Sequence, residues 1–147
     1  MKSSLIGFSD GSSKAYAAVV YLRNELKNGK ISSILVCSKA RVAPLEKCDT
    51  KKFTIPRLEL LGCFILTHLM EMAEKSLTEA KFVISEKRFY SDSTISLGRI
   101  KGLENEYHQW VGNRVNAIRA KSQIEDWYYV PTKKNASDLP SRGCSLT

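Results

Sequence analysis

The sequence predicts an α/β fold in which a five-stranded mixed sheet is flanked by helices, with the elements in the order βββαβααβ. Two observations lead to this prediction. The N-terminal part consists of β-forming runs separated by turn signals, and the rest alternates segments of helical period with further β-forming runs. Strands joined by short turns pair antiparallel, whereas strands joined through a helix pair in parallel. We therefore expect an antiparallel meander of the first three strands, which the later strands extend in parallel.

The first three strands are predicted from their composition and their turns. A run over about residues 5–9 precedes the turn signal DGSS, and AYAAVVYLR follows it. The connection to ISSILVCSKARV contains the hairpin pair Asn28-Gly29. This third run has the period-two pattern of a sheet that is covered on one face. The residues expected to share that face are Ile34, Val36, Ala40 and Val42.

The later elements begin with IPRLELLGCFILTHLMEMAEKSL, which has Pro56 in its first turn and continues as a helix. Because its first half is apolar nearly all round, we expect this helix to be deeply buried. AKFVISEKRFYS and IEDWYYVP supply the fourth and fifth strands, DSTISLGRIK and ENEYHQWVGNRVNAIRAK supply the helices between them, and NASDLPSRG closes the chain. The main apolar stripe of the first helix is Leu58, Leu61, Ile65, Leu69 and Met72.

Size and composition indicate one globular domain over residues 1–147, with 43% apolar residues. No stretch approaches the roughly 18 uninterrupted apolar residues that a membrane helix needs, so we expect no membrane contact and a cytoplasmic or nuclear location. The net charge of +8 favours a polyanionic partner. The four cysteines show no metal-binding or redox spacing and are expected to be free thiols.

Four acids stand in apolar or turn settings, and each has a purely structural interpretation. Asp10 follows the first strand and could belong to an Asp-Gly turn, and Glu59 could favour a helix N-terminus. Asp92 and Asp138 could be helix N-caps. Taken singly, each structural interpretation is at least as good as a functional one.

Taken together, the same acids suggest a metal site. Glu59 lies in a helix that looks buried on all sides, and a buried lone carboxylate is costly unless it is paired or metal-bound. Two strand ends and a buried helix turn could bring three acids together, and hard oxygen ligands select Mg²⁺ or Mn²⁺. Two such ions about 3.5–4 Å apart can activate a water and stabilise the leaving oxygen in phosphodiester cleavage.

The segments that carry these acids resemble a known family. FSDGSSKAYAAVVYLR, SKARVAP, TIPRLELLG, YSDSTISL, WVGNRVNAIR and YVPTKKNASDLPSRG are similar to the ribonuclease H domain of Pao/BEL-type LTR retrotransposon polyproteins, within the RNase H-like superfamily. The resemblance runs across nearly the whole chain. It implies an RNase H-like fold and an endonuclease that cuts the RNA strand of RNA–DNA hybrids during reverse transcription.

The resemblance also implies the cofactor and its ligands. Two Mg²⁺ ions are expected, with Mn²⁺ able to substitute. Asp10 would lie between the two ions, with Glu59 and Asp92 on one and Asp138 on the other. The expected partners are the hybrid and the reverse transcriptase domain of the same polyprotein, the isolated domain is expected to be monomeric, and retroelement particles are the expected location.

Contacts to the hybrid are expected from hydroxyl, amide and basic side chains, because a protein reads a hybrid through its phosphates and 2′-hydroxyls. The candidate residues are Ser12, Ser13, Arg57, Ser93, Thr94, Arg114, Lys133, Lys134, Asn135 and Arg142. For each of them a solvated surface position is the alternative. Trp110 and Trp127 are expected in the core, and His68 and His108 are expected to be packing or surface residues.

The chain departs from the family pattern in two places. Cellular ribonucleases H carry a mobile histidine shortly before the last aspartate, whereas no histidine lies between Trp127 and Asp138 here, and Tyr129 stands where related elements often have one. Only GLEN separates the short helix from the next, which leaves no room for a basic handle that holds the hybrid. We therefore expect slower turnover, and we expect the reverse transcriptase to supply part of the grip on the hybrid.

A non-enzymatic alternative stays open. The chain could be a degenerate copy that binds nucleic acid or scaffolds a polyprotein without cutting. The presence of all four acids argues against decay, although recent descent would also preserve them. Hybrid binding without Mg²⁺-dependent cleavage would identify this case.

Overall fold

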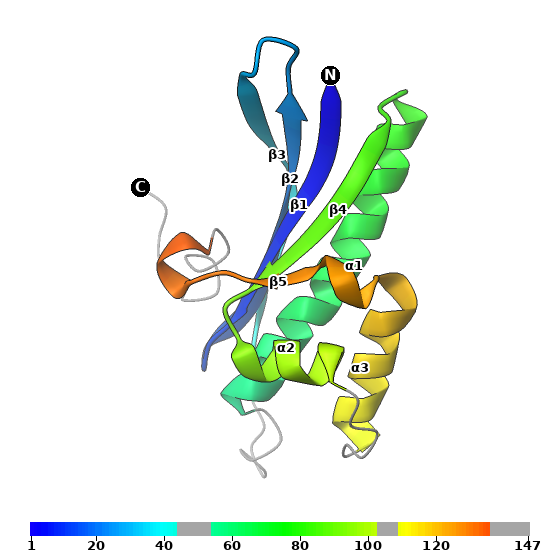
Figure 1. The fold of residues 1–147 in the computed structure, drawn as a ribbon. Helices are drawn as coiled ribbons and strands as arrows, with labels where there is room; N and C mark the ends of the chain where they lie inside the picture. Colours follow the sequence, from blue (N-terminus) through cyan, green and yellow to red (C-terminus); the bar gives the residue numbers. More distant parts are fainter. Residues whose placement is uncertain (44–53, 103–108, 136–147) are drawn as a thin grey trace.

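The computed structural model describes residues 1–43, 54–102 and 109–135, and it contains the predicted five-stranded mixed sheet (Figure 1). The strand order is β3-β2-β1-β4-β5, in which β1, β2 and β3 pair antiparallel while β4 and β5 pair in parallel. The strands are β1 (Lys2–Gly11), β2 (Ala15–Glu25), β3 (Ile31–Val42), β4 (Ile84–Ser91) and β5 (Trp127–Tyr129). The predicted topology is confirmed.

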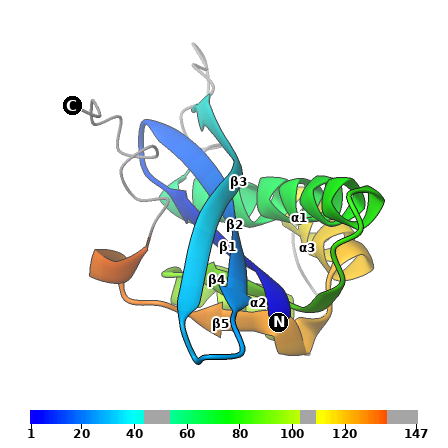
Figure 2. The same cartoon turned by 90° about the horizontal axis from the view of Figure 1, so that it is seen from above.

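The helices pack together against the sheet. The long helix α1 contacts β1 and β2, and α3 lies alongside α1 (Figures 1 and 2). No helix within the described ranges is long and apolar enough to span a membrane. The helical elements are α1 (Ile55–Glu79), α2 (Thr94–Lys101), α3 (Gln109–Lys121) and the 3₁₀ turns η1 (Ile124–Asp126) and η2 (Thr132–Lys134).

The core lies between the sheet and α1. Leu5, Leu66, Phe89 and Trp127 are at most 1% exposed, which confirms the predicted burial of the first half of α1 and the core position of Trp127. One member of the predicted stripe is wrong, because Met72 is 62% exposed. The stripe through Leu69 continues one helical turn later at the buried Ala73.

The predicted apolar face of β3 is also wrong. Ile34 pairs with Leu22, on the face that packs against α1, whereas Ala40 pairs with Ala17 on the opposite face. A register shift between these two pairs acts as a β-bulge, which moves the downstream side chains to the other face. Because β3 is an edge strand, Ile34 remains 57% and Val42 79% exposed.

The cysteines match the expectation where the structure describes them. Cys37 is a half-buried free thiol, and Cys63 is a fully buried one. Cys48 and Cys144 lie outside the described residues.

Candidate metal centre

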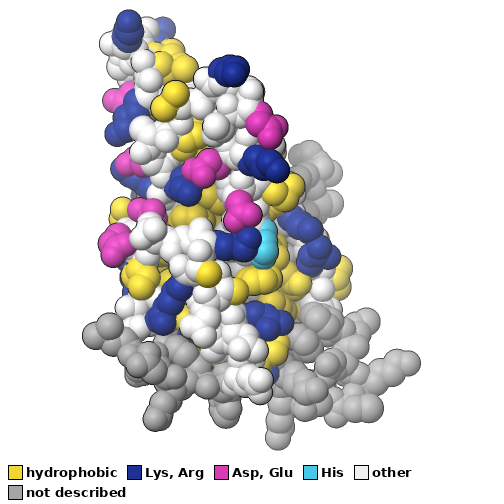
Figure 3. All heavy atoms as spheres, turned by 90° about the vertical axis from the view of Figure 1, so that its right-hand side faces the viewer, with side chains coloured by type: hydrophobic (Ala, Val, Ile, Leu, Met, Phe, Trp, Pro, Cys, Tyr) yellow, Lys and Arg dark blue, Asp and Glu magenta, His cyan; other side chains and the backbone are white. Residues whose placement is uncertain are grey.

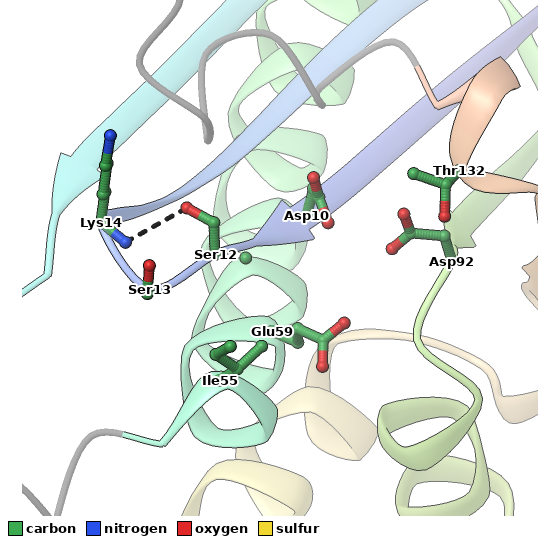
Figure 4. Close-up of a pocket in the computed structure, with 9 residues that line it drawn as sticks. Asp10, Ser12, Ser13, Lys14, Ile55, Glu59, Asp92 and Thr132 are labelled. Carbon is green, nitrogen blue, oxygen red and sulfur yellow. Dashed lines mark hydrogen bonds between the residues drawn. The ribbon is translucent and has the colours of Figure 1, made fainter.

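Three carboxylates meet at one end of the sheet. Asp10 is the penultimate residue of β1, Asp92 directly follows β4, and Glu59 lies in the second turn of α1. The parallel ladder pairs Ser9 with Ser91, so the two aspartates leave neighbouring strands side by side. One carboxylate oxygen from each of the three acids lies within 4.8 Å of the other two (Figure 4). The structure thus brings together three of the four predicted metal ligands, and Asp138 lies outside the described residues.

Two glycines allow the strand and the helix to come this close. A Cβ atom on Gly11 would lie 2.5 Å from the backbone nitrogen of Glu59, and one on Gly62 would lie 2.7 Å from the carbonyl oxygen of Asp10. The sequence did not predict that these two glycines position the acids. The available signal was Gly62 itself, because a glycine inside a helix costs about 1 kcal/mol relative to alanine and indicates close packing.

Asp92 is not the cap of α2. The N-cap is Ser93, whose Oγ accepts a hydrogen bond from the backbone N–H of Ser96 at 3.1 Å. Asp92 lies one residue before the cap, and its Oδ1 is buried without a hydrogen-bond partner among the described residues. A buried carboxylate oxygen without a partner is costly, and a bound cation at this position would offset that cost.

The pKa of Glu59 also indicates that this cluster suits a cation. Burial raises the pKa of Glu59, the charge of Asp92 raises it further, and a hydrogen bond from the Ser93 hydroxyl opposes both effects. Beneath the acids, burial raises the pKa of the Cys63 thiol to about 11. Without a cation the charge of Asp92 thus disfavours ionisation of Glu59, whereas a divalent cation at this position would favour the ionised form of Glu59. An all-carboxylate donor set with an unpartnered oxygen fits Mg²⁺ or Mn²⁺.

A cavity of about 520 Å³ opens over the carboxylates (Figure 4). Besides the acids it is lined by Gly11, Ser12, Ser13, Lys14, Ile55 and Thr132. Lys14 and Thr132 were not among the residues that the sequence predicted for the site. Lys14 follows Asp10 closely in the chain, which was a usable signal, whereas Thr132 is brought to the cavity only by the fold.

The predicted hydroxyl contacts occupy different environments. Ser12 stabilises the β1–β2 turn, since its Oγ accepts the backbone N–H groups of Lys14 and Ala15 at 3.2 and 3.3 Å. Ser13 is exposed at the cavity, and Thr94 is exposed at the start of α2. Ser93 is 4% exposed and caps the helix, so its hydroxyl is engaged within the protein.

The remaining candidates do not line this cavity or lie outside the described residues. Asn135 is 6% exposed, and its Nδ2 donates a hydrogen bond to the Ser9 carbonyl at 2.8 Å, which ties the chain after η2 to β1. Lys134 is exposed, and Arg57 and Arg114 lie where α1 meets α3. Nothing is described for the side chain of Lys133 or for Arg142.

The histidines do not enter the described metal cluster. His68 packs edge-on against Phe64, with ring centroids 4.7 Å apart, which agrees with its predicted packing role. His108 lies outside the described residues.

Solved ribonucleases H share this fold. The N-terminal RNase H domain of Rv2228c from Mycobacterium tuberculosis, solved as a fusion with maltose-binding protein, superposes with a TM-score of 0.66 at 14% identity, covering 97% of this chain and 93% of that chain. LC11-RNase H1, solved in complex with an RNA/DNA hybrid, gives a TM-score of 0.56 at 14% identity and covers 96% of each chain. RNase H1 from Halobacterium salinarum gives 0.50 at 12% identity, covering 98% of this chain and all of that chain. At these identities the likeness establishes the fold alone.

Sequence comparison identifies the family. No curated protein matches the chain. The family model described as "Pao retrotransposon-like RNaseH-like domain" matches residues 1–93, a range that contains Asp10, Glu59 and Asp92. This match agrees with the predicted resemblance and with the superposed structures. The chain therefore belongs to the Pao retrotransposon-like RNaseH-like domain family.

Proposed function

We propose that this domain is a metal-dependent ribonuclease H that hydrolyses the RNA strand of RNA–DNA hybrids. The observation that carries the proposal is the convergence of one carboxylate oxygen each from Asp10, Glu59 and Asp92 within 4.8 Å. One buried Asp92 oxygen has no hydrogen-bond partner among the residues that the structure describes. The fold supports it, because solved ribonucleases H superpose on this chain, one of them in complex with a hybrid.

The proposed ligands divide between two Mg²⁺ sites, in which Mn²⁺ can substitute. Asp10 would help to hold both ions, Glu59 and Asp92 would hold the first, and Asp138 would hold the second. The assignment of Asp138 rests on the sequence resemblance, and Asn135, three residues earlier in the chain, is held against β1 beside Asp10. When bound, two such metal ions lower the pKa of a coordinated water and stabilise the charge on the leaving oxygen.

The residues of the chain supply positioning. The rigid contact of β1 with α1 fixes Asp10 relative to Glu59, and Ser93 orients the Glu59 carboxylate through its hydroxyl. Ser13 and Thr132 line the cavity and are suited to hydrogen-bond the 2′-hydroxyl or the phosphate of a bound strand. The open cavity admits both the strand and water.

The biological setting is part of the proposal. A domain of this retrotransposon family fits a polyprotein in which a reverse transcriptase makes the hybrid and this domain removes its RNA strand. The reverse transcriptase is the proposed partner, and retroelement particles in the cytoplasm or the nucleus are the proposed location.

The test is cleavage of an RNA–DNA hybrid labelled on its RNA strand, with Mg²⁺, with Mn²⁺ and with chelator. We expect metal-dependent cutting of the RNA strand and a loss of at least about 100-fold in Asp92→Asn, because removal of even an indirect metal contact costs roughly 10–100-fold. Asp126→Asn in η1, away from the metal centre, is the matched control and should retain activity. Hybrid binding with no cleavage, even after addition of the reverse transcriptase, would identify the silent alternative.

A further inference from the structure

A stack of cations on an aromatic ring joins α1 to α3. The guanidinium carbon of Arg57, from α1, lies 5.2 Å from the centroid of the Trp110 ring, and that of Arg114, one turn after Trp110 on α3, lies 4.8 Å from it. Arg114 also lies 5.9 Å from the ring of Phe64. All four side chains are half-buried, and basic and hydrophobic side chains intermingle on this side of the molecule (Figure 3).

The charge of Arg114 is not balanced by an ion pair with a carboxylate within the described ranges. Two guanidinium groups that share one indole repel each other, and an anion placed between or above them relieves that repulsion. A guanidinium that lies on a ring face keeps its in-plane N–H donors available and its plane fixed, which suits the two-point recognition of a phosphate.

The position of the stack limits which phosphate it can contact. Arg57 and Glu59 are two residues apart on α1, so they lie about 3 Å apart along the helix axis and roughly 200° apart around it. The stack and the carboxylates therefore lie on different sides of the same helix turn, separated by about the 10–12 Å diameter of a helix. A phosphate held at the carboxylates is out of reach of the stack, whereas other phosphates of the same duplex are not.

We propose that Arg114 and Arg57, held on Trp110, bind backbone phosphates of the RNA–DNA hybrid away from the cleaved position and seat the duplex against the metal centre. This inference rests on the proposed nuclease function for its ligand. It assigns Trp110 a supporting role, in which the ring orients the two arginines instead of stacking on a base. The stack takes the place of a separate basic handle.

The test measures hybrid binding by fluorescence anisotropy in an Asp92→Asn background, which does not cut, over a range of salt concentrations beginning at about 50 mM. Arg114→Gln should weaken binding about tenfold and reduce the slope of log K against log salt by about one, as the loss of one phosphate contact predicts. Arg114→Lys keeps the charge and should retain the slope while losing part of the affinity. Arg57→Gln should behave like Arg114→Gln.

The matched control is Arg23→Gln. Arg23 lies on the sheet face opposite α1, 3.8 Å from Glu25, and its loss should leave the salt slope unchanged. In the unmodified domain, Arg114→Gln should raise KM for hybrid cleavage with little change in kcat, because the contact is equal in the ground and transition states. Circular dichroism checks that each variant folds, and Arg57→Gln serves as the test variant if Arg114→Gln does not.

The outcomes separate the two proposals. Equal salt slopes for Arg114→Gln, Arg57→Gln and Arg23→Gln would overturn the inference and leave the nuclease standing, with the stack only joining two helices. Arg114-dependent binding by a domain that never cuts would retain the binding site and overturn the nuclease. A domain that binds no hybrid at about 50 mM salt would overturn this inference, and it would overturn the nuclease as well only if added reverse transcriptase failed to give cleavage.

Discussion

Gly11 and the backbone of Glu59 are in direct contact, since a Cβ atom on Gly11 would lie 2.5 Å from the Glu59 nitrogen. The contact is reciprocated one helical turn later by Gly62, which faces the carbonyl oxygen of Asp10. The distance between the Asp10 and Glu59 carboxylates is therefore set by backbone packed on backbone. A backbone contact cannot yield by a rotamer change, so this spacing is stiff.

Gly62→Ala should damage the metal centre more than the fold. The added methyl group pushes α1 from β1 at a cost of about 1–3 kcal/mol, partly offset by the gain of about 1 kcal/mol in helix propensity. We expect metal affinity and hybrid cleavage to fall about 10–100-fold, as for other disturbances of a ligand's support. Thermal unfolding with and without Mg²⁺ measures the affinity.

Gly98→Ala is the control for this substitution. Gly98 lies within α2, and a Cβ atom there meets nothing within 4 Å. The variant should keep its activity and gain up to about 1 kcal/mol in stability from helix propensity. Equal activity losses in Gly62→Ala and Gly98→Ala would contradict the proposed role of the close contact.

Glu59→Gln should stabilise the metal-free domain. Burial and Asp92 raise the pKa of Glu59, so the folded state holds this proton more tightly than the unfolded chain. In chelator, the free energy of unfolding should therefore fall as pH rises from the ordinary pKa of 4.5 towards the raised value, and Glu59→Gln should remove this decline. Urea unfolding between about pH 4 and 8 measures it.

With Mg²⁺ the pH dependence should reverse, because metal binding requires the ionised carboxylates and so strengthens as pH rises. Glu59→Gln should lose this metal-dependent gain. Glu79→Gln, at the exposed C-terminal end of α1, should behave like the unmodified domain in both conditions. A Glu59→Gln domain that is less stable than the unmodified one in chelator would show that the carboxylate is satisfied without a metal.

Asn135→Ala should loosen the connection between η2 and β1. The substitution removes a buried hydrogen bond to the Ser9 carbonyl, a loss of about 0.5–1.5 kcal/mol in the free energy of unfolding. If Asp138 is the fourth ligand, cleavage should fall by more than this loss of stability explains at temperatures where the domain stays folded. Asn116→Ala, exposed on α3, is the control and should change neither property.

The convergence of the acids was predictable because local sequence marks where each element ends. Asp10 and Asp92 each follow a β-forming run, and parallel pairing then brings the two strand ends together. The cap of α2 was not predictable, since Asp92 and Ser93 are both capping types and only the end of β4 at Ser91 decides between them. The bulge in β3 shifts the pairing by one residue, which alters no local pattern that a sequence shows.

The features that the sequence did not predict depend on contacts between distant segments. Gly11 and Gly62 matter because of what lies opposite them, and that depends on the packing of α1 on β1. Trp110 was predicted in the core, and it packs at the edge of the core. The part of its ring that the core does not bury is in contact with Arg57 and Arg114. An aromatic residue surrounded by basic ones is a weak signal in the sequence and a specific one once the helices are placed.

Arg119 should be the most sensitive surface arginine for stability, because its side chain terminates α2. Its Nε donates to the carbonyl of Ile100 at 2.9 Å, and its Nη2 donates to the carbonyls of Arg99 and Gly102 at 3.0 and 2.6 Å. These carbonyls belong to the last turn of α2 and to its C-cap, Gly102, and the charge lies at the favourable end of the helix dipole. Arg119→Met keeps the apolar stem and should cost about 1.5–3 kcal/mol in the free energy of unfolding.

The consequence should extend to the metal centre, because α2 begins directly after Asp92 and Ser93. Arg119→Met should therefore weaken Mg²⁺-dependent stabilisation as well as lower the urea midpoint, whereas Arg119→Lys, with a single point of donation, should restore only part of both. Lys121→Met on the same helix removes an exposed ion pair with Glu71 at 3.0 Å and should change neither the urea midpoint nor metal binding appreciably, because solvent screens such a pair. Equal losses in Arg119→Met and Lys121→Met would mean that α2 is positioned by its apolar contacts alone.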